Sequence, residues 1–255
     1  MKKTHYMPIA PISVLEKHFD EYTNRTRVMV LAHLCEQGNQ YTEFYQKTRH
    51  NRSFILLDNG AAENSQLTDK QLFEKIELIQ PTCVVAPDTL YDGRSTVEKT
   101  FAFVKKLRKN GFKCHVMAVP HGSTEQEYLS TFKIFNESDE INWIGVSKFV
   151  SVKPFIDRCT CMYNVLQHNT IRKPIHILGC NNPIEMVYLK QCDNVYSIDS
   201  CIAWLYGYNN LELPYDNSLK QRLDTPEDFF DYIYDQKQIY QSISNVIKMD
   251  KLCNL

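Results

Sequence analysis

Short apolar runs recur along the chain, and each is followed by a longer stretch in which apolar residues return at helical spacing. An apolar run that stops at turn residues is typical of a strand buried on both faces of a parallel sheet. The alternation therefore predicts eight strand-then-helix units. The predicted strands are 5–10, 27–34, 53–58, 82–87, 113–120, 142–147, 174–179 and 194–198.

Helix starts are marked by a polar residue followed three positions later by an acid or amide, which is the capping-box pattern. The pattern predicts starts at Ser13 with Glu16, Thr68 with Gln71, Ser95 with Glu98, and Ser123 with Gln126. Further helices are expected around 41–45, over about 153–168, and from Pro183, since proline suits the first helical position. The expected buried faces are Val14, Leu15 and Phe19; Tyr41, Phe44 and Tyr45; Leu72, Ile76 and Ile79; and Val97, Phe101, Val104 and Leu107, with Gly111 ending the last helix.

After the eighth unit the pattern changes. Residues 206–223 are predicted to form a loop, and a long final helix is predicted to open at Thr225-Pro226 with Asp228. Its apolar face would carry Phe229, Ile233, Ile243 and Ile247.

Eight such units closing on themselves make a (β/α)8 TIM barrel, and 255 residues fit the usual size of about 250 for that fold. An open doubly wound sheet is the alternative, but no strand is followed by the G-x-G-x-x-G fingerprint of dinucleotide-binding sheets. We therefore expect an α/β protein with a single domain over 1–255. Residues 1–205 would form the barrel, and 206–255 the loop and helix packed on its outside.

Composition supports one globular domain with reduced thiols. The chain is 43% hydrophobic, and 29 Lys and Arg nearly balance 30 Asp and Glu, so a nucleic acid would meet a local basic patch and not a basic protein. The nine cysteines are odd in number and scattered, and neither a signal peptide nor an apolar stretch of about 18 residues is present. We expect no disulfide framework, no membrane partner and a cytoplasmic location.

Three predicted strands end in an acid, and these acids are candidate functional residues. Asp58 is the last residue of the third strand, and Asp88 and Asp199 directly follow the fourth and eighth strands, at the end of a parallel barrel that binds ligands. Strands three and eight lie far apart around the ring, so Asp58 and Asp199 can face each other across the mouth. That arrangement suits two acids acting on opposite sides of a glycosidic carbon. The alternative is that each Asp merely caps the next helix.

Eight short segments resemble, in order and spacing, the strand-end motifs of the tRNA-guanine transglycosylase superfamily. They are YMPIAP, VMVLAHL, LLDNGA, VVAPDT, AVPHG, IGVSK, HILGC and YSIDSC. Members of that superfamily exchange a guanine for a 7-deazaguanine in a nucleic acid. The resemblance implies that Asp199 attacks the sugar, that Asp58 is the general acid and base, and that Asp88 holds the purine.

The resemblance also implies an altered base pocket. Its expected contacts are Asn59, Gly60, Asp88, His121 and Gly145. His121 stands where the family commonly has a glutamine, and Asn59-Gly60-Ala61-Ala62 replaces Ser-Gly-Gly-Phe.

The chain departs from the tRNA enzymes in its metal ligands. Those enzymes carry a zinc cluster of Cys and His after the last strand, where this chain has only Cys201 and Cys253. Cys159 and Cys161, near His168, lie two positions apart on a predicted helix and do not share one face. We therefore expect neither zinc nor another cofactor.

Without that zinc module, the chain resembles the compact DNA-modifying branch of the superfamily found in phages and bacterial islands. The expected partners are DNA, single-stranded or locally opened, and a free 7-deazaguanine base, in the cytoplasm of a bacterial or phage-infected host cell. Phosphate contacts are expected from Lys148, Lys153 and Arg94, and base stacking from Tyr91, Tyr206 and Tyr208, with solvated charges and ordinary packing as the alternatives.

Other functions use the same residues. A DNA glycosylase would let water replace the incoming base. A lysine at the end of the sixth strand, here Lys148, can form a Schiff base with a small carbonyl substrate. A binding protein without catalysis is disfavoured by three convergent acids.

Overall fold

The protein is a (β/α)8 barrel, as the alternation of apolar runs and helices predicts. The computed structural model describes residues 4–17, 25–61, 67–148, 158–180, 182–189, 191–214 and 223–254. Within these ranges the strands are β1 (His5–Pro8), β2 (Arg27–Leu31), β3 (Phe54–Asp58), β4 (Cys83–Val85), β5 (His115–Ala118), β6 (Trp143–Ser147), β7 (Ile175–Leu178) and β8 (Val195–Ser200).

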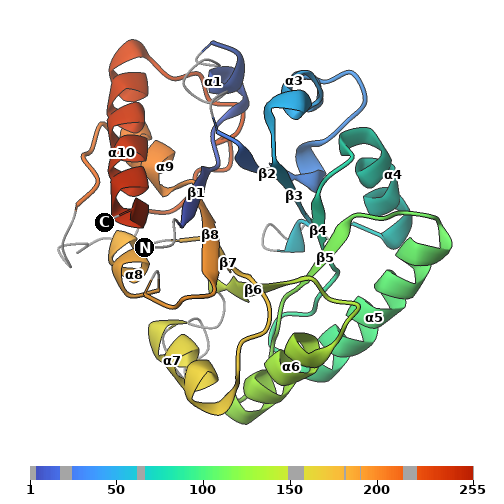
Figure 1. The fold of residues 1–255 in the computed structure, drawn as a ribbon. Coiled ribbons are helices and arrows are strands. Elements are labelled where there is room, and N and C mark those ends of the chain that lie inside the picture. Colours follow the sequence, from blue (N-terminus) through green and yellow to red (C-terminus); the bar gives the residue numbers. More distant parts are fainter. Residues whose placement is uncertain are drawn as a thin grey trace.

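All eight strands are parallel, in the order β1-β8-β7-β6-β5-β4-β3-β2. The two ends of this order, β1 and β2, contact each other, so the sheet curls into a nearly closed barrel (Figure 1). Each predicted strand overlaps an observed one. The second is shorter than predicted, because Ala32–Leu34 turns into a 3-10 helix (η1).

Helices surround the barrel (Figure 1). They are α1 (Ile12–Lys17), α3 (Gln40–Thr48), α4 (Asp69–Ile79), α5 (Gly93–Lys109), α6 (Glu125–Glu137), α7 (Arg158–His168), α8 (Pro183–Leu189), α9 (Ile202–Tyr208) and α10 (Gln236–Asn254), with a 3-10 turn, η2, over Arg49–Asn51. Within the described ranges, none of these helices is both long and apolar enough to cross a membrane.

One predicted cap is confirmed in full. Thr68 and Gln71 form a capping box at the start of α4, and its face of Leu72, Ile76 and Ile79 is buried. Pro183 is likewise the first residue of α8, as predicted.

Two other predicted caps are wrong because a neighbouring residue takes the role. The side chain of Asp92 accepts a hydrogen bond from the Ser95 amide at 2.8 Å, so α5 begins three residues earlier than predicted. Thr124 caps α6 by accepting from the Glu127 amide at 3.2 Å. Ser123 instead donates its hydroxyl to the Glu127 carboxylate at 2.6 Å.

The first helix also starts before its predicted cap. Ile12 already belongs to α1, and the Ser13 hydroxyl donates to the carbonyl of Tyr232 at 2.7 Å, which ties this helix to the C-terminal segment. Val14 and Leu15 are buried as expected, whereas Phe19 lies outside the described residues.

The C-terminal prediction was wrong in two respects. Residues predicted as loop include the last turn of helix α9, and α10 starts at Gln236, well after Thr225-Pro226. Asp235 and Gln238 explain the later start, because each side chain accepts from the other's backbone amide at 2.8–2.9 Å. The buried face of α10 therefore includes Ile239, Val246 and Met249, while Ile233 and Ile247 are 73% and 49% exposed.

Helix α10 packs against α9 and α8 on the outside of the barrel (Figure 1). The buried Asn245 side chain joins the segments, since it donates to the Leu211 carbonyl at 3.0 Å and accepts from the Leu213 amide at 2.9 Å. Gly207 permits the close approach of α9 to α10. A Cβ at this position would lie 2.7 Å from the Ser242 Cα.

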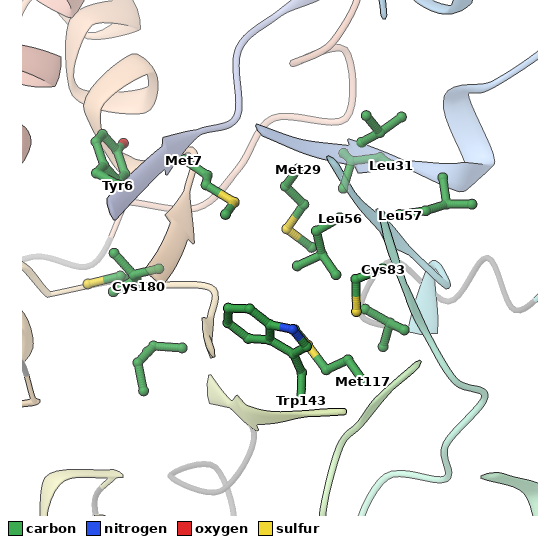
Figure 2. Packing of buried hydrophobic residues seen from close by; sticks show 14 of the residues in the cluster. Tyr6, Met7, Met29, Leu31, Leu56, Leu57, Cys83, Met117, Trp143 and Cys180 are labelled. Carbon is green, nitrogen blue, oxygen red and sulfur yellow. The ribbon is translucent and has the colours of Figure 1, made fainter. Parts of the chain in front are cut away.

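Apolar side chains fill the interior of the barrel below its carboxyl ends. Alternate residues of each strand point inward. Figure 2 shows one such group in the centre of the barrel, made of Met7, Met29, Leu56, Cys83 and Met117, with Trp143 beside Met117. The Trp143 ring packs on Phe54 with 4.8 Å between ring centroids. This packed interior gives the carboxyl-end residues a rigid floor.

The contact of α9 with α10 yields a stability prediction. Gly207→Ala forces its new methyl group into the Ser242 backbone, so we expect a loss of about 1–3 kcal/mol in the free energy of unfolding, measured by urea denaturation. Ser242→Ala is the matched control: the Ser242 hydroxyl is buried without a hydrogen-bond partner among the described residues, so its removal should not destabilise. Equal losses in both variants would contradict this account of the packing.

Candidate active site

A cavity of about 250 Å³ opens at the carboxyl ends of the strands. Every strand contributes a residue at its carboxyl end or just after it. These residues are Ile9, Leu31, Asp58, Val85, Val119, Ser147, Leu178 and Asp199. The cavity therefore occupies the barrel mouth, where (β/α)8 enzymes hold their catalytic groups.

The three predicted acids come together in this cavity. Asp58, Asp88 and Asp199 all line it and are 7%, 4% and 3% exposed. Lys148 is the only basic side chain among the described residues that line it. The site is acidic overall, and an acidic site favours positive charge that develops in a bound substrate.

Asp199 lies within β8 and is held from the neighbouring strand. Its Oδ1 accepts hydrogen bonds from His176 Nε2 and from the Gly179 amide, both at 3.0 Å. Among the described residues, no hydrogen bond reaches its Oδ2. The carboxylate of this cavity-lining residue is thus fixed through one oxygen.

A bulge in β8 determines that Asp199 faces the cavity. Ile175 pairs with Val195, whereas His176 pairs with Ser197, so Tyr196 is an extra residue on β8. If the pairing were regular after Val195, Tyr196 would lie opposite His176, and Ser197 and Asp199 would shift by one position along β7 and point away from the barrel axis. The bulge thus aims Asp199 at the cavity and aligns Ser197 with His176.

Asp58 is the last residue of β3, and its Oδ2 accepts from the Gly60 amide at 3.1 Å. Gly60 has φ +76°, a conformation that favours glycine, and this turn brings its amide back to Asp58. Gly60 does not line the cavity, so its observed role is to shape the loop that presents Asp58.

Asp88 has both carboxylate oxygens engaged. Oδ1 accepts from Asn59 Nδ2 at 2.8 Å, and Oδ2 lies 2.6 Å from His121 Nε2. Asn59 also donates to the Ala86 carbonyl at 2.8 Å. His121 is 2% exposed and stands behind Asp88, outside the cavity lining, so it orients Asp88 and does not itself reach the cavity.

Gly145 lies beneath the cavity. A Cβ there would come within 2.7 Å of Leu178 and 3.1 Å of Val119, which are two lining residues. Its missing side chain lets these residues pack as the floor.

The predicted phosphate-binding residues are not grouped. Lys148 enters the cavity and lies across Gly179, where an added Cβ would come within 3.1 Å of its Cδ. The Arg94 side chain is 89% exposed and pairs with Glu98 at 3.1 Å, away from the cavity. Lys153 lies outside the described residues.

The tyrosines expected to stack on bases do not line the cavity. Tyr206 is buried, and Tyr208 packs edge-on against Tyr232 with 4.5 Å between ring centroids. Tyr91 is half-buried, at a backbone φ of +65°.

The thiols near the site are protonated at neutral pH. Burial raises the pKa of both Cys180 and Cys201, which makes them poor metal ligands and nucleophiles. Across the described parts of the chain, no three His, Cys, Asp or Glu side chains are grouped to hold a metal ion.

Sequence reasoning missed Arg158, which is 1% exposed and supports the site from behind. It forms a bidentate pair with Glu185 at 2.7 and 3.1 Å. It also donates to the Leu178 carbonyl at 2.7 Å, and this carbonyl belongs to the peptide whose Gly179 amide binds Asp199. Burial opposes its charge, but Glu185 raises the pKa of Arg158 above its usual value, so the guanidinium stays charged.

His176 was also missed, although it lies in the segment HILGC. A histidine within an apolar strand was the available signal, because a buried polar side chain needs hydrogen-bond partners.

The fold and the cavity define the protein as a (β/α)8 barrel with an acidic pocket at the carboxyl ends of its strands. No family model matches the chain, and no curated protein matches it at a significant level.

Arg158 yields the prediction for this site. Arg158→Met leaves Glu185 and several backbone carbonyls without their buried donor, so we expect a loss of about 3–5 kcal/mol in the free energy of unfolding, measured by urea denaturation. Arg94→Met removes an exposed pair and should change this free energy by no more than about 0.5 kcal/mol. A small effect of Arg158→Met would show that the carboxyl ends of β6 and β7 do not depend on it.

Proposed function

We propose that this protein is a base-exchanging transglycosylase that replaces guanine in DNA with a 7-deazaguanine through a covalent aspartyl-sugar intermediate. The observation that carries the proposal is the pair of carboxylates, Asp58 and Asp199, that line one small cavity from strands on different sides of the barrel. The resemblance of eight strand-end segments to the tRNA-guanine transglycosylase superfamily supports the same reaction.

The reaction assigns opposite tasks to the two acids. Asp199 Oδ2 attacks C1′ of the flipped nucleotide while protonated Asp58 donates its proton to the departing guanine. The sugar is then held as an ester on Asp199. The incoming base, deprotonated by Asp58, attacks C1′ and displaces Asp199, so two inversions give net retention.

The charge of the cavity supports this chemistry. The transition state of glycosidic cleavage resembles an oxocarbenium ion, and three carboxylates against one lysine stabilise positive charge at the sugar. Asp88 is suited to base selection, because it lines the cavity with its carboxylate held in place by Asn59 and His121, and a carboxylate accepts hydrogen bonds from the N–H groups of a purine. Flipping the nucleotide costs a few kcal/mol, which such contacts help to offset.

Lys148 supports a second candidate, a Schiff-base enzyme acting on a small carbonyl compound, because it lies in the same cavity as the carboxylates. Borohydride reduction in the presence of substrate separates the two. A transglycosylase gives no reduced lysine adduct, whereas a Schiff-base enzyme gives one on Lys148.

A DNA glycosylase would use the same two carboxylates with water as the acceptor. Incubation with labelled DNA and no added base tests this alternative, since only the hydrolase accumulates abasic sites.

Two substitutions test the roles of the catalytic carboxylates. Asp199→Asn removes the nucleophile, so incorporation of labelled guanine into DNA should fall at least about 10³-fold. Asp58→Asn removes proton transfer and should slow exchange about 10²- to 10⁴-fold. Both variants should fold and still bind DNA.

The control is Asp139→Asn, because Asp139 is exposed and precedes β6 at the amino ends of the strands, whereas the cavity lies at their carboxyl ends, so exchange should be unchanged. An Asp199→Asn protein that exchanged base at a near wild-type rate would contradict the assignment of Asp199 as the nucleophile.

The second prediction concerns the nucleic acid. The net charge is −1, and of the predicted phosphate-binding residues that are described only Lys148 lies in the cavity. We therefore expect only two to four phosphates to be neutralised. Binding to duplex DNA should fall with salt at a log-log slope of about −2 to −4, and less steeply for single strands.

Competition titrations with DNA and tRNA at several salt concentrations measure both the slope and the preference. A clear preference for tRNA would overturn DNA as the substrate and leave the glycosidic chemistry standing.

A further inference from the structure

A buried histidine connects Asp199 to the interior of the barrel. His176 lies in the middle of β7, is 0% exposed and does not line the cavity. Its Nε2 lies 3.0 Å from Asp199 Oδ1, and its Nδ1 lies 2.8 Å from the hydroxyl of Ser197, also 0% exposed. Ser197, His176 and Asp199 thus form a hydrogen-bonded chain that leads from the core to the cavity wall.

The Asp199 carboxylate at the end of this chain determines which ring nitrogen of His176 carries the proton. An ionised carboxylate can only accept hydrogen bonds, so the ring proton of His176 must lie on Nε2. In the neutral ring Nδ1 is then an acceptor, and the Ser197 hydroxyl donates to it. Asp199 therefore selects this tautomer, and the Ser197 hydroxyl, which can donate or accept, holds the other side of the ring.

We propose that His176 is a positioning residue that holds Asp199 Oδ1, so that Oδ2 attacks the sugar and Asp199 later departs readily as a carboxylate. This role rests on the proposed transglycosylase function. Two donors, His176 and the Gly179 amide, meet on Oδ1, whereas no hydrogen bond reaches Oδ2 from the described residues.

The two half-reactions depend on this hydrogen bond in different ways. In the first, the Oδ2–C1′ bond forms, the C1′–N bond breaks, and the proton of Asp58 goes to the departing base. In the second, the incoming base bonds to C1′, its proton goes to Asp58, and the electron pair of the Oδ2–C1′ bond returns to Asp199. A donor on Oδ1 stabilises the returning charge and therefore accelerates the second half-reaction.

Removal of the donor should consequently prolong the life of the covalent intermediate. Loss of the hydrogen bond removes both orientation and stabilisation of the leaving carboxylate in the second step. In the first step, the loss of orientation is partly balanced by a more nucleophilic carboxylate. A residue that served only folding would slow both steps together or neither.

The test measures formation and breakdown of the protein–DNA adduct separately by rapid quench on denaturing gels. With His176→Phe, which keeps a ring and removes the donor, we expect adduct breakdown on adding guanine to slow about 100-fold, and formation to slow no more than about tenfold. His176→Gln retains a side-chain N–H and should recover most of the breakdown rate. Ser197→Ala removes only the hydroxyl that holds the His176 ring at Nδ1 and should slow breakdown about 2- to 10-fold.

Leu56→Met is the control, because Leu56 is fully buried in the same interior, does not line the cavity and is replaced by a residue of similar volume. Its two rates should match those of the wild-type protein. If His176→Phe does not fold, His176→Gln and Ser197→Ala still decide the question.

The outcomes separate this role from the function on which it rests. Wild-type protein that formed no adduct and exchanged no base would overturn both. Wild-type exchange with equal breakdown rates in wild-type, His176→Phe and Ser197→Ala proteins would overturn the role of His176 alone. Equal slowing of both steps would make His176 a purely structural residue.

Discussion

Burial of the Asp199 carboxylate is the constraint on which the site depends. A carboxylate that is 3% exposed needs buried hydrogen-bond donors, and His176 in β7 and the amide of Gly179, just after this strand, supply them. The peptide of that amide is in turn held by Arg158 through its carbonyl. This network spans β7, β8 and α7. A change in the register between β7 and β8 would therefore turn Asp199 away from the cavity and remove its hydrogen-bond donors.

The three carboxylates in the cavity have different hydrogen-bond partners, and this difference supports a different role for each in the reaction. Asp199 is bound through one oxygen, Asp58 accepts from the Gly60 amide in its own turn, and Asp88 is engaged through both oxygens. Carboxylates in different environments can act as nucleophile, acid and base, and ligand anchor within one site. Below them the packed apolar interior keeps each carboxylate at a fixed height.

The sequence predicts the strands and the position of the acids because both depend on local patterns. Apolar runs mark buried strands, and an acid at the end of a run in a parallel barrel must meet the others at the mouth. The network behind Asp199 was not predictable in this way. His176 lies opposite Ser197 only because of the bulge at Tyr196. The hydrophobic pattern of the sequence does not predict this bulge. The late start of α10 depends on the two reciprocal hydrogen bonds between Asp235 and Gln238. In the sequence, Thr225-Pro226 is an equally good helix start and lies earlier.

Mapping of the covalent intermediate tests most directly the claim that Asp199 is the nucleophile. Wild-type protein is mixed with a guanine-containing oligonucleotide, denatured during the first turnovers, digested with nuclease and protease, and analysed by tandem mass spectrometry. The account predicts a sugar-phosphate mass on the peptide at Asp199, which disappears when excess base is added before denaturation. An adduct on Lys148, on any other residue, or on none in a preparation that exchanges bases would contradict it.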